Sequence, residues 1–101
     1  MAATPEKKVK DKVKAVLTKA GAYHFTPATH GFGMSGVPDI IGCYNGYFFA
    51  IECKAGANKP TELQLKNLAS IEKQGGYALV VNEDNIAHVT RMLEEIDAEV
   101  R

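Results

Sequence analysis

Apolar residues recur at helical spacing near the beginning of the chain. The stripe consists of Val9, Val13, Val16, Leu17 and Ala20. It predicts a helix from about Thr4 to Ala20, which Thr4 can cap and Pro5 can begin. Glu6 precedes Val13 by seven residues and therefore points along the same apolar face, about 20° away from it. The helix dipole favours an acid in the first turn, but this inward orientation also makes Glu6 a candidate for chemistry.

The rest of the chain alternates between β-type runs and two further amphipathic helices. Strands are predicted over about 22–26, 37–44, 47–54 and 77–81, and helices over about 61–73 and 84–100. Asn45-Gly46 separates two of the strands and is a strong hairpin signal. In the helix over 61–73 the residues expected to face inward are Leu65, Leu68 and Ala69, with Leu63 and Ile71 as further candidates. This order, α-β-β-β-α-β-α, predicts an α/β fold with a mixed sheet.

Length and composition are those of one ordinary globular domain over residues 1–101. Hydrophobic residues make up 46% of the 101 residues and charged residues 24%. No apolar run approaches the ~20 residues that span a bilayer, and no signal peptide opens the chain, so we expect a cytoplasmic protein without membrane contact. The two cysteines show no zinc spacing. Cys43 and Cys53 fall on opposite sheet faces, so we expect two buried, unpaired thiols.

Charge is balanced overall but unevenly distributed. Twelve basic residues match twelve acidic ones, whereas residues 1–19 sum to +4 and residues 82–101 to −4. The basic end could face a polyanion, both ends could be solvated helix faces, or the two ends could attract each other.

The hairpin register brings two acidic residues together. A two-residue turn at Asn45-Gly46 pairs Tyr44 with Tyr47, and continuing outward it places Asp39 opposite Glu52. Opposed side chains share a face with Cβ atoms about 4.5–5.5 Å apart. Lys54 lies two residues beyond Glu52 and shares that face.

Two carboxylates at ~5 Å repel each other by about 3 kcal/mol at an effective dielectric of ~20. Protonation, solvent exposure or a bound cation would relieve this repulsion, and the apolar neighbours argue against open solvent. A hard divalent cation such as Mg²⁺ prefers such oxygens, and an adjacent lysine suits hydrolysis of a phosphodiester by metal-activated water. The alternative is a cross-strand ion network, common on sheets.

The motifs resemble a known nuclease signature. Gly36-Val37-Pro38-Asp39 followed by Glu52-Cys53-Lys54 resembles the PD-(D/E)XK superfamily. The segments 36–41, 51–56, 61–64 and 75–81 are more specifically similar to its VRR-NUC family, in the form of small, stand-alone, phage-type members. The resemblance implies a restriction-endonuclease-like αβββαβ core, here with an additional C-terminal helix.

The resemblance also implies roles for individual residues. Asp39 and Glu52 would ligate Mg²⁺ or Mn²⁺ together with Glu6 and the main-chain carbonyl of Cys53, and Lys54 would assist the attacking water. Gln64 would reach the site from the second helix, although Thr61-x-x-Gln64 is equally a capping box.

Candidate DNA contacts are Ser35, His30, Lys59, Lys66 and Lys8. Each has an ordinary alternative, because loop polar residues and lysines are commonly just solvated. Contacts of this kind would be made to phosphates and carry no sequence information.

The function expected from these features is a metal-dependent endodeoxyribonuclease. Structure-selective cleavage of Holliday-junction, branched or flap DNA by a homodimer is what the resemblance implies. The alternative is a nucleic-acid-binding subunit on a nuclease scaffold with little catalysis of its own.

Overall fold

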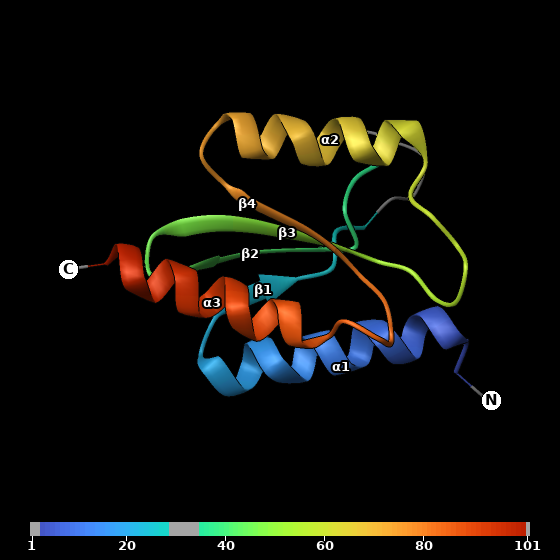
Figure 1. Ribbon diagram of the computed structural model, residues 1–101, viewed down its shortest axis with the longest axis horizontal. Helices are drawn as coiled ribbons and strands as arrows, with labels where there is room; N and C mark the ends of the chain where they lie inside the picture. Colours follow the sequence, from blue (N-terminus) through green and yellow to red (C-terminus); the bar gives the residue numbers. More distant parts are fainter. Residues whose placement is uncertain (1–2, 29–34, 101) are drawn as a thin grey trace.

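In the part of the chain that the structure describes, three helices and four strands follow one another in the predicted order. The computed structural model describes residues 3–28 and 35–100. Its elements are α1 (Pro5–Ala20), β1 (Tyr23–Phe25), β2 (Ile40–Tyr44), β3 (Tyr47–Cys53), α2 (Glu62–Lys73), β4 (Tyr77–Val81) and α3 (Ala87–Glu99). The mixed sheet, the flanking helices and the C-terminal helix confirm the predicted fold class (Figure 1).

The sheet has the order β1-β2-β3-β4, with antiparallel pairs up to β3 and a parallel β3–β4 pair. The predicted hairpin register is confirmed, since Tyr44 pairs with Tyr47 and Ile41 with Ala50. Asn45 and Gly46 have φ of 49° and 89°. Two successive positive φ values are what a two-residue type I′ turn requires, which explains the choice of these residues.

Helix α1 is delimited by local signals. The Thr4 side chain accepts a hydrogen bond from the Lys7 N–H, and the helix ends at Gly21 in the left-handed conformation, with φ of 81°. Between these ends the buried residues are Val9, Val13 and Leu17.

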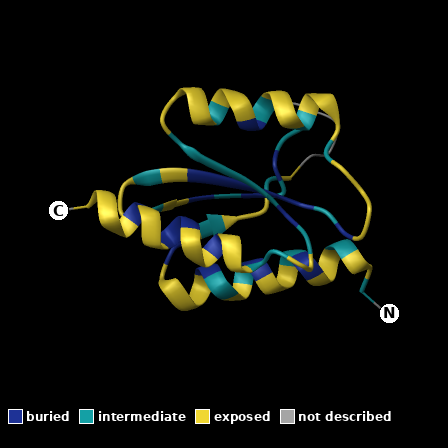
Figure 2. Ribbon diagram, viewed as in Figure 1, coloured by how far each residue is buried: buried dark blue, intermediate teal, exposed yellow. Residues whose placement is uncertain are grey.

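The helices cover the two faces of the sheet unequally. Helices α1 and α3 lie on one face and α2 on the other (Figure 1). The main core forms on the α1/α3 side, where Phe49, Ile51 and Cys53 of β3 are buried among residues of both helices. Figure 2 marks the buried residues in dark blue on the sheet and on parts of α1 and α3.

Helix α2 packs less extensively than its sequence pattern predicted. Leu68 is buried and Ile71 half-buried, but Leu63 and Leu65 are 45% and 49% exposed and Ala69 is exposed as well. The expectation that Leu65 and Ala69 face inward is therefore wrong. Helix α2 contacts the two strands β3 and β4. This contact buries Leu68 and leaves the rest of the predicted apolar face partly or largely exposed.

Three further expectations need correction. Strand β2 begins at Ile40 rather than at residue 37, because Pro38 has no N–H to donate to a sheet ladder. Helix α3 begins at Ala87 rather than at residue 84, because the side chains of Asn82 and Asn85 form a turn, with Asn82 N–H donating to Asn85 Oδ1 at 2.6 Å. Cys43 is exposed, whereas Cys53 is buried as expected.

No helix within the described ranges has both the length and the apolar composition needed to span a membrane.

Candidate metal centre

Glu52 is a buried acid near the end of β3. The alternation of side chains along the strand sends Phe49, Ile51 and Cys53 to the α1/α3 core and Glu52 to the opposite face. β3 is an interior strand with neighbours on both sides, and the Glu52 residue is only 1% exposed. Burial of this kind is unusual for a carboxylate without a compensating partner.

Asp39 lies one residue before β2 and is fixed by two contacts. Its Oδ2 accepts a hydrogen bond from the Cys53 N–H at 2.8 Å, and its Oδ1 lies 3.8 Å from the Lys10 Nζ. The last ladder pair is Ile40 with Ile51. Asp39 lies one residue beyond this pair, and its carboxylate is close to that of Glu52, as the register predicted.

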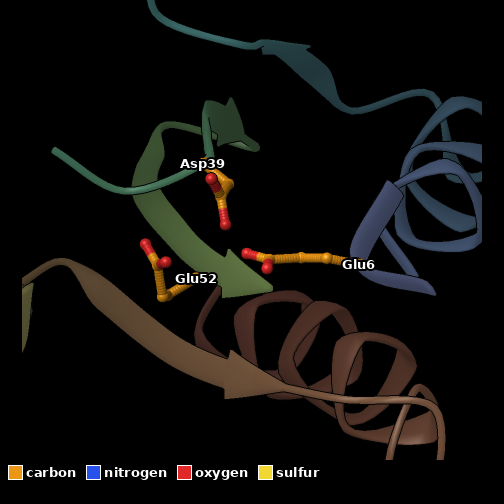
Figure 3. Close-up of side chains that lie close together, drawn as sticks. All are labelled: Glu6, Asp39 and Glu52. Atoms are coloured by element: carbon orange, nitrogen blue, oxygen red, sulfur yellow. The ribbon is translucent and has the colours of Figure 1, made fainter. Parts of the chain in front are cut away.

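Glu6 brings a third carboxylate from the first turn of α1. Carboxylate oxygens of Glu6, Asp39 and Glu52 all lie within 4.8 Å of one another. Figure 3 shows the three side chains converging from α1, from the segment before β2 and from β3. The inward orientation predicted for Glu6 is thus what the fold produces, with the side chain half-buried.

Burial and like charge strongly perturb Glu52. Removal from water raises the pKa of Glu52 to about 7, and the negative charge of Asp39 acts in the same direction. The Lys54 Nζ lies 3.2 Å from Glu52 Oε2 and lowers the pKa in part. Glu52 Oε1 is buried and has no hydrogen-bond partner among the residues that the structure describes.

The donor set fits a hard divalent cation. Opposite oxygen ligands of Mg²⁺ are about 4.2 Å apart, so small side-chain rotations would bring oxygens now within 4.8 Å into one coordination sphere. A cation would also satisfy the orphaned Glu52 Oε1. Burial raises the pKa of the Cys53 thiol to about 12, with Asp39 and Glu52 contributing, so the metal-free thiol is protonated at neutral pH.

Gln64 forms the predicted capping box at the start of α2. Its Oε1 accepts from the Thr61 N–H at 2.8 Å, and its own N–H donates to Thr61 Oγ1 at 3.1 Å. The prediction that Gln64 forms a capping box with Thr61 is confirmed. A role for Gln64 in the centre, like the ligand role of the Cys53 carbonyl, stays a prediction.

The predicted DNA contacts are distributed over the surface. Ser35, Lys8, Lys59 and Lys66 are exposed, and His30 lies outside the described residues. Ser35 and Lys66 line the same cavity of about 220 Å³ beside α2, so the structure brings these two together. Their contact with DNA stays a prediction.

Sequence reasoning missed the place of Lys10. In the sequence it is one of several lysines in α1, yet the structure sets its ammonium group against Asp39. A signal was available, because Lys10 follows Glu6 by four residues and so lies on the same helix face.

No family model matches the chain, and no curated protein matches it in sequence. A solved structure described as a VRR_NUC domain is similar in three dimensions, with a TM-score of 0.70 and 24% sequence identity. The similarity covers 91% of this chain and 97% of that chain. The chain has the VRR_NUC fold. This match agrees with the family that the sequence motifs resemble and confirms the restriction-endonuclease-like fold implied by the resemblance.

Proposed function

We propose that the protein is a metal-dependent endodeoxyribonuclease of the VRR-NUC family that hydrolyses phosphodiester bonds. The observation that carries the proposal is the convergence of Glu6, Asp39 and Glu52, with Glu52 Oε1 buried and unpartnered in the described structure and Lys54 alongside. Burying like charges is costly, and a cation-binding role accounts for that cost. The VRR_NUC fold supports the same function.

Three carboxylates are the proposed ligands of Mg²⁺ or Mn²⁺, with the Cys53 carbonyl as a further candidate. A divalent cation bound there would supply Lewis acidity and lower the pKa of a water molecule. The Cys53 N–H fixes Asp39 through its Oδ2, and one carboxylate oxygen of Asp39 lies within 4.8 Å of oxygens of Glu6 and Glu52. Glu6 enters from a separate element, so correct docking of α1 is needed to complete the set.

Lys54 is the proposed catalytic lysine. Its side chain is only 13% exposed, and its Nζ contacts Glu52 Oε2 at 3.2 Å. An ammonium group held in this way can donate a hydrogen bond to the attacking water or to a phosphate oxygen as negative charge develops on it. The ion pair with Glu52 restricts the position of the lysine.

Gln64 and several surface residues are proposed to contact the substrate. The Nε2 of Gln64 takes no part in the capping box, which uses the Oε1 and the backbone N–H. The Nε2 has no hydrogen-bond acceptor among the described residues, so it can donate to a phosphate. Ser35, His30, Lys59, Lys66 and Lys8 are the proposed contacts to the DNA backbone. With these contacts made to phosphates, selection would depend on DNA shape, which favours branched, flap or junction DNA.

The proposed assembly is a homodimer. β4 is an edge strand of the described sheet, and its residues Tyr77–Val81 include no charge. Natural proteins cover or protect such edges, and a second copy pairing along β4 would do so. Two copies would also provide one centre for each strand of a duplex. Multi-angle light scattering would give twice the chain mass, and a monomer at all concentrations would contradict the dimer.

The direct test uses purified protein and a panel of four-way, flap, duplex and single-stranded DNAs. Cleavage is expected with Mg²⁺ or Mn²⁺, none in EDTA, and preference for branched substrates. Asp39→Asn and Glu52→Gln, which preserve side-chain shape, should abolish cleavage while circular dichroism shows an intact fold. Cleavage that persists in EDTA would contradict the proposal.

A second readout is the metal itself. Mn²⁺ should raise the melting temperature of the wild type saturably and leave Asp39→Asn unaffected, because a ligand that binds only the folded state stabilises it. DNA binding without cleavage under every metal condition would instead support the binding-subunit alternative.

A further inference from the structure

A basic cleft adjoins the carboxylate cluster on the side of α1. It has a volume of about 370 Å³ and lies between α1 and Thr26, which follows β1. Its charged lining consists of the lysines Lys7, Lys10 and Lys14 and the acids Glu6, a member of the cluster, and Asp11, which leaves an excess of one positive charge. The cleft and the candidate metal centre are therefore continuous through Glu6.

In the described structure, neither Lys10 nor Lys14 forms an ion pair with another residue of the cleft lining. The Lys7 Nζ pairs with Asp11 at 2.9 Å, so this pair contributes little net charge. Lys14 Nζ has no carboxylate oxygen within 4 Å among residues 3–28 and 35–100. Lys10 contacts only Asp39, at 3.8 Å, which is at the long limit of an ion pair.

Lys10 faces the Asp39 oxygen that does not accept the Cys53 N–H. The two oxygens of Asp39 are in different situations, since Oδ2 accepts from the Cys53 N–H and Oδ1 faces Lys10. A divalent cation on Oδ1 would repel the ammonium group at this distance. The side chain of Lys10 is 25% exposed and can turn into the adjoining cleft.

We propose that Lys10 and Lys14 form a binding site for the phosphate backbone of one nucleic-acid strand, next to the phosphate that is cleaved. Without a cation, Lys10 neutralises Asp39. With a cation on the carboxylates, Lys10 turns to a substrate phosphate, and Lys14, one turn further along α1, binds the same strand. This inference rests on the proposed function and assigns Lys10 two alternating partners. Charge complementarity selects a polyanion as the occupant.

Three matched variants on one helix test the inference. Lys10→Gln and Lys14→Gln alter the cleft, and Lys12→Gln removes the same charge from an exposed position of α1 outside the cleft lining. Binding of fluorescently labelled DNA is measured by anisotropy in Ca²⁺ over a range of salt concentrations. Mn²⁺ binding is measured without DNA by titration calorimetry, so neither readout depends on turnover.

The expected results differ between the variants. Lys10→Gln and Lys14→Gln each weaken DNA binding about tenfold at low salt and reduce the slope of log K against log salt by about 0.7–0.9, the value for one phosphate contact. Lys10→Gln also binds Mn²⁺ more tightly, because it removes a competing cation, while Lys14→Gln leaves Mn²⁺ affinity unchanged. Lys12→Gln changes neither quantity.

Several results would overturn the inference. If Lys10 only positions Asp39, Lys10→Gln weakens Mn²⁺ binding and leaves the salt slope intact. If the lysines act through overall charge alone, Lys12→Gln weakens DNA binding as much as the other two. If the wild type cleaves DNA, either of these results for the variants removes the inference and leaves the proposed function standing. A wild type that binds neither Mn²⁺ nor DNA removes both.

Discussion

Replacing Glu52 by Gln removes one buried negative charge and keeps the side-chain shape. Burial, reinforced by Asp39, raises the pKa of Glu52 from 4.5 to about 7. The folded chain therefore binds this proton more tightly than the unfolded chain does. Stability from this group is greatest below pH 4.5, falls as the pH rises toward 7, and levels off above it. At about 1.36 kcal/mol per pKa unit, the ionised carboxylate costs the metal-free wild type about 3 kcal/mol.

Glu52→Gln should thus match the wild type near pH 4.5 and exceed its unfolding free energy by about 3 kcal/mol at pH 8. For a domain of this size that is a gain of more than about 10 °C in melting temperature. Urea unfolding followed by circular dichroism in EDTA at both pH values measures the difference. Saturating Mn²⁺ should reverse the order at pH 8, since it stabilises only the wild type.

The reasoning would be refuted by a difference between the two proteins that does not change from pH 4.5 to pH 8. It would also be refuted if Glu52→Gln were the less stable protein at pH 8 in EDTA, because the buried charge would then stabilise the fold. A third outcome is that Glu52→Gln loses Mn²⁺ binding while its unfolding free energy relative to the wild type does not change with pH. That result would support Glu52 as a metal ligand and refute only the electrostatic argument.

Three further predictions concern single residues. Lys54→Met should lower cleavage at least about 100-fold with a circular dichroism spectrum like that of the wild type, and unchanged rates would exclude a catalytic lysine. Gln64→Ala removes the capping box and should lower the free energy of unfolding by about 1 kcal/mol. Gln64→Glu keeps an acceptor for the cap and should lose only cleavage. Urea unfolding and cleavage assays separate the two roles. Gly42→Ala should lose about 1–3 kcal/mol of stability in thermal melts, because its Cβ would collide with the Tyr23 carbonyl and lie 2.5 Å from Phe49 Cζ; unchanged stability would show that β1 can shift.

Local signals determined the elements and much of the hairpin. The ends of α1 follow from Thr4 and Gly21, and the pairing of β2 with β3 follows from Asn45-Gly46. Each of these depends on hydrogen bonds between residues close in the chain. The expectation that Asp39 and Glu52 lie close together came from the same local rule.

Burial was predicted less well where it depends on what covers an element. The periodicity of α2 did not reveal that Leu63 and Leu65 would remain exposed, and Cys43 was expected inside. An amphipathic pattern gives the direction of an apolar face, but the width of the contact depends on the neighbouring strands.

The sequence by itself indicated Asp39 and Glu52 as candidate site residues and predicted the hairpin register that brings them close together. Only the tertiary structure decided that Glu52 is almost fully buried, that Glu6 reaches the same point from α1, and that Lys10 faces Asp39. The physical reason is the packing of α1 against the sheet. It brings together side chains that are 29 or more residues apart in the sequence, at distances that neither helical nor strand periodicity specifies.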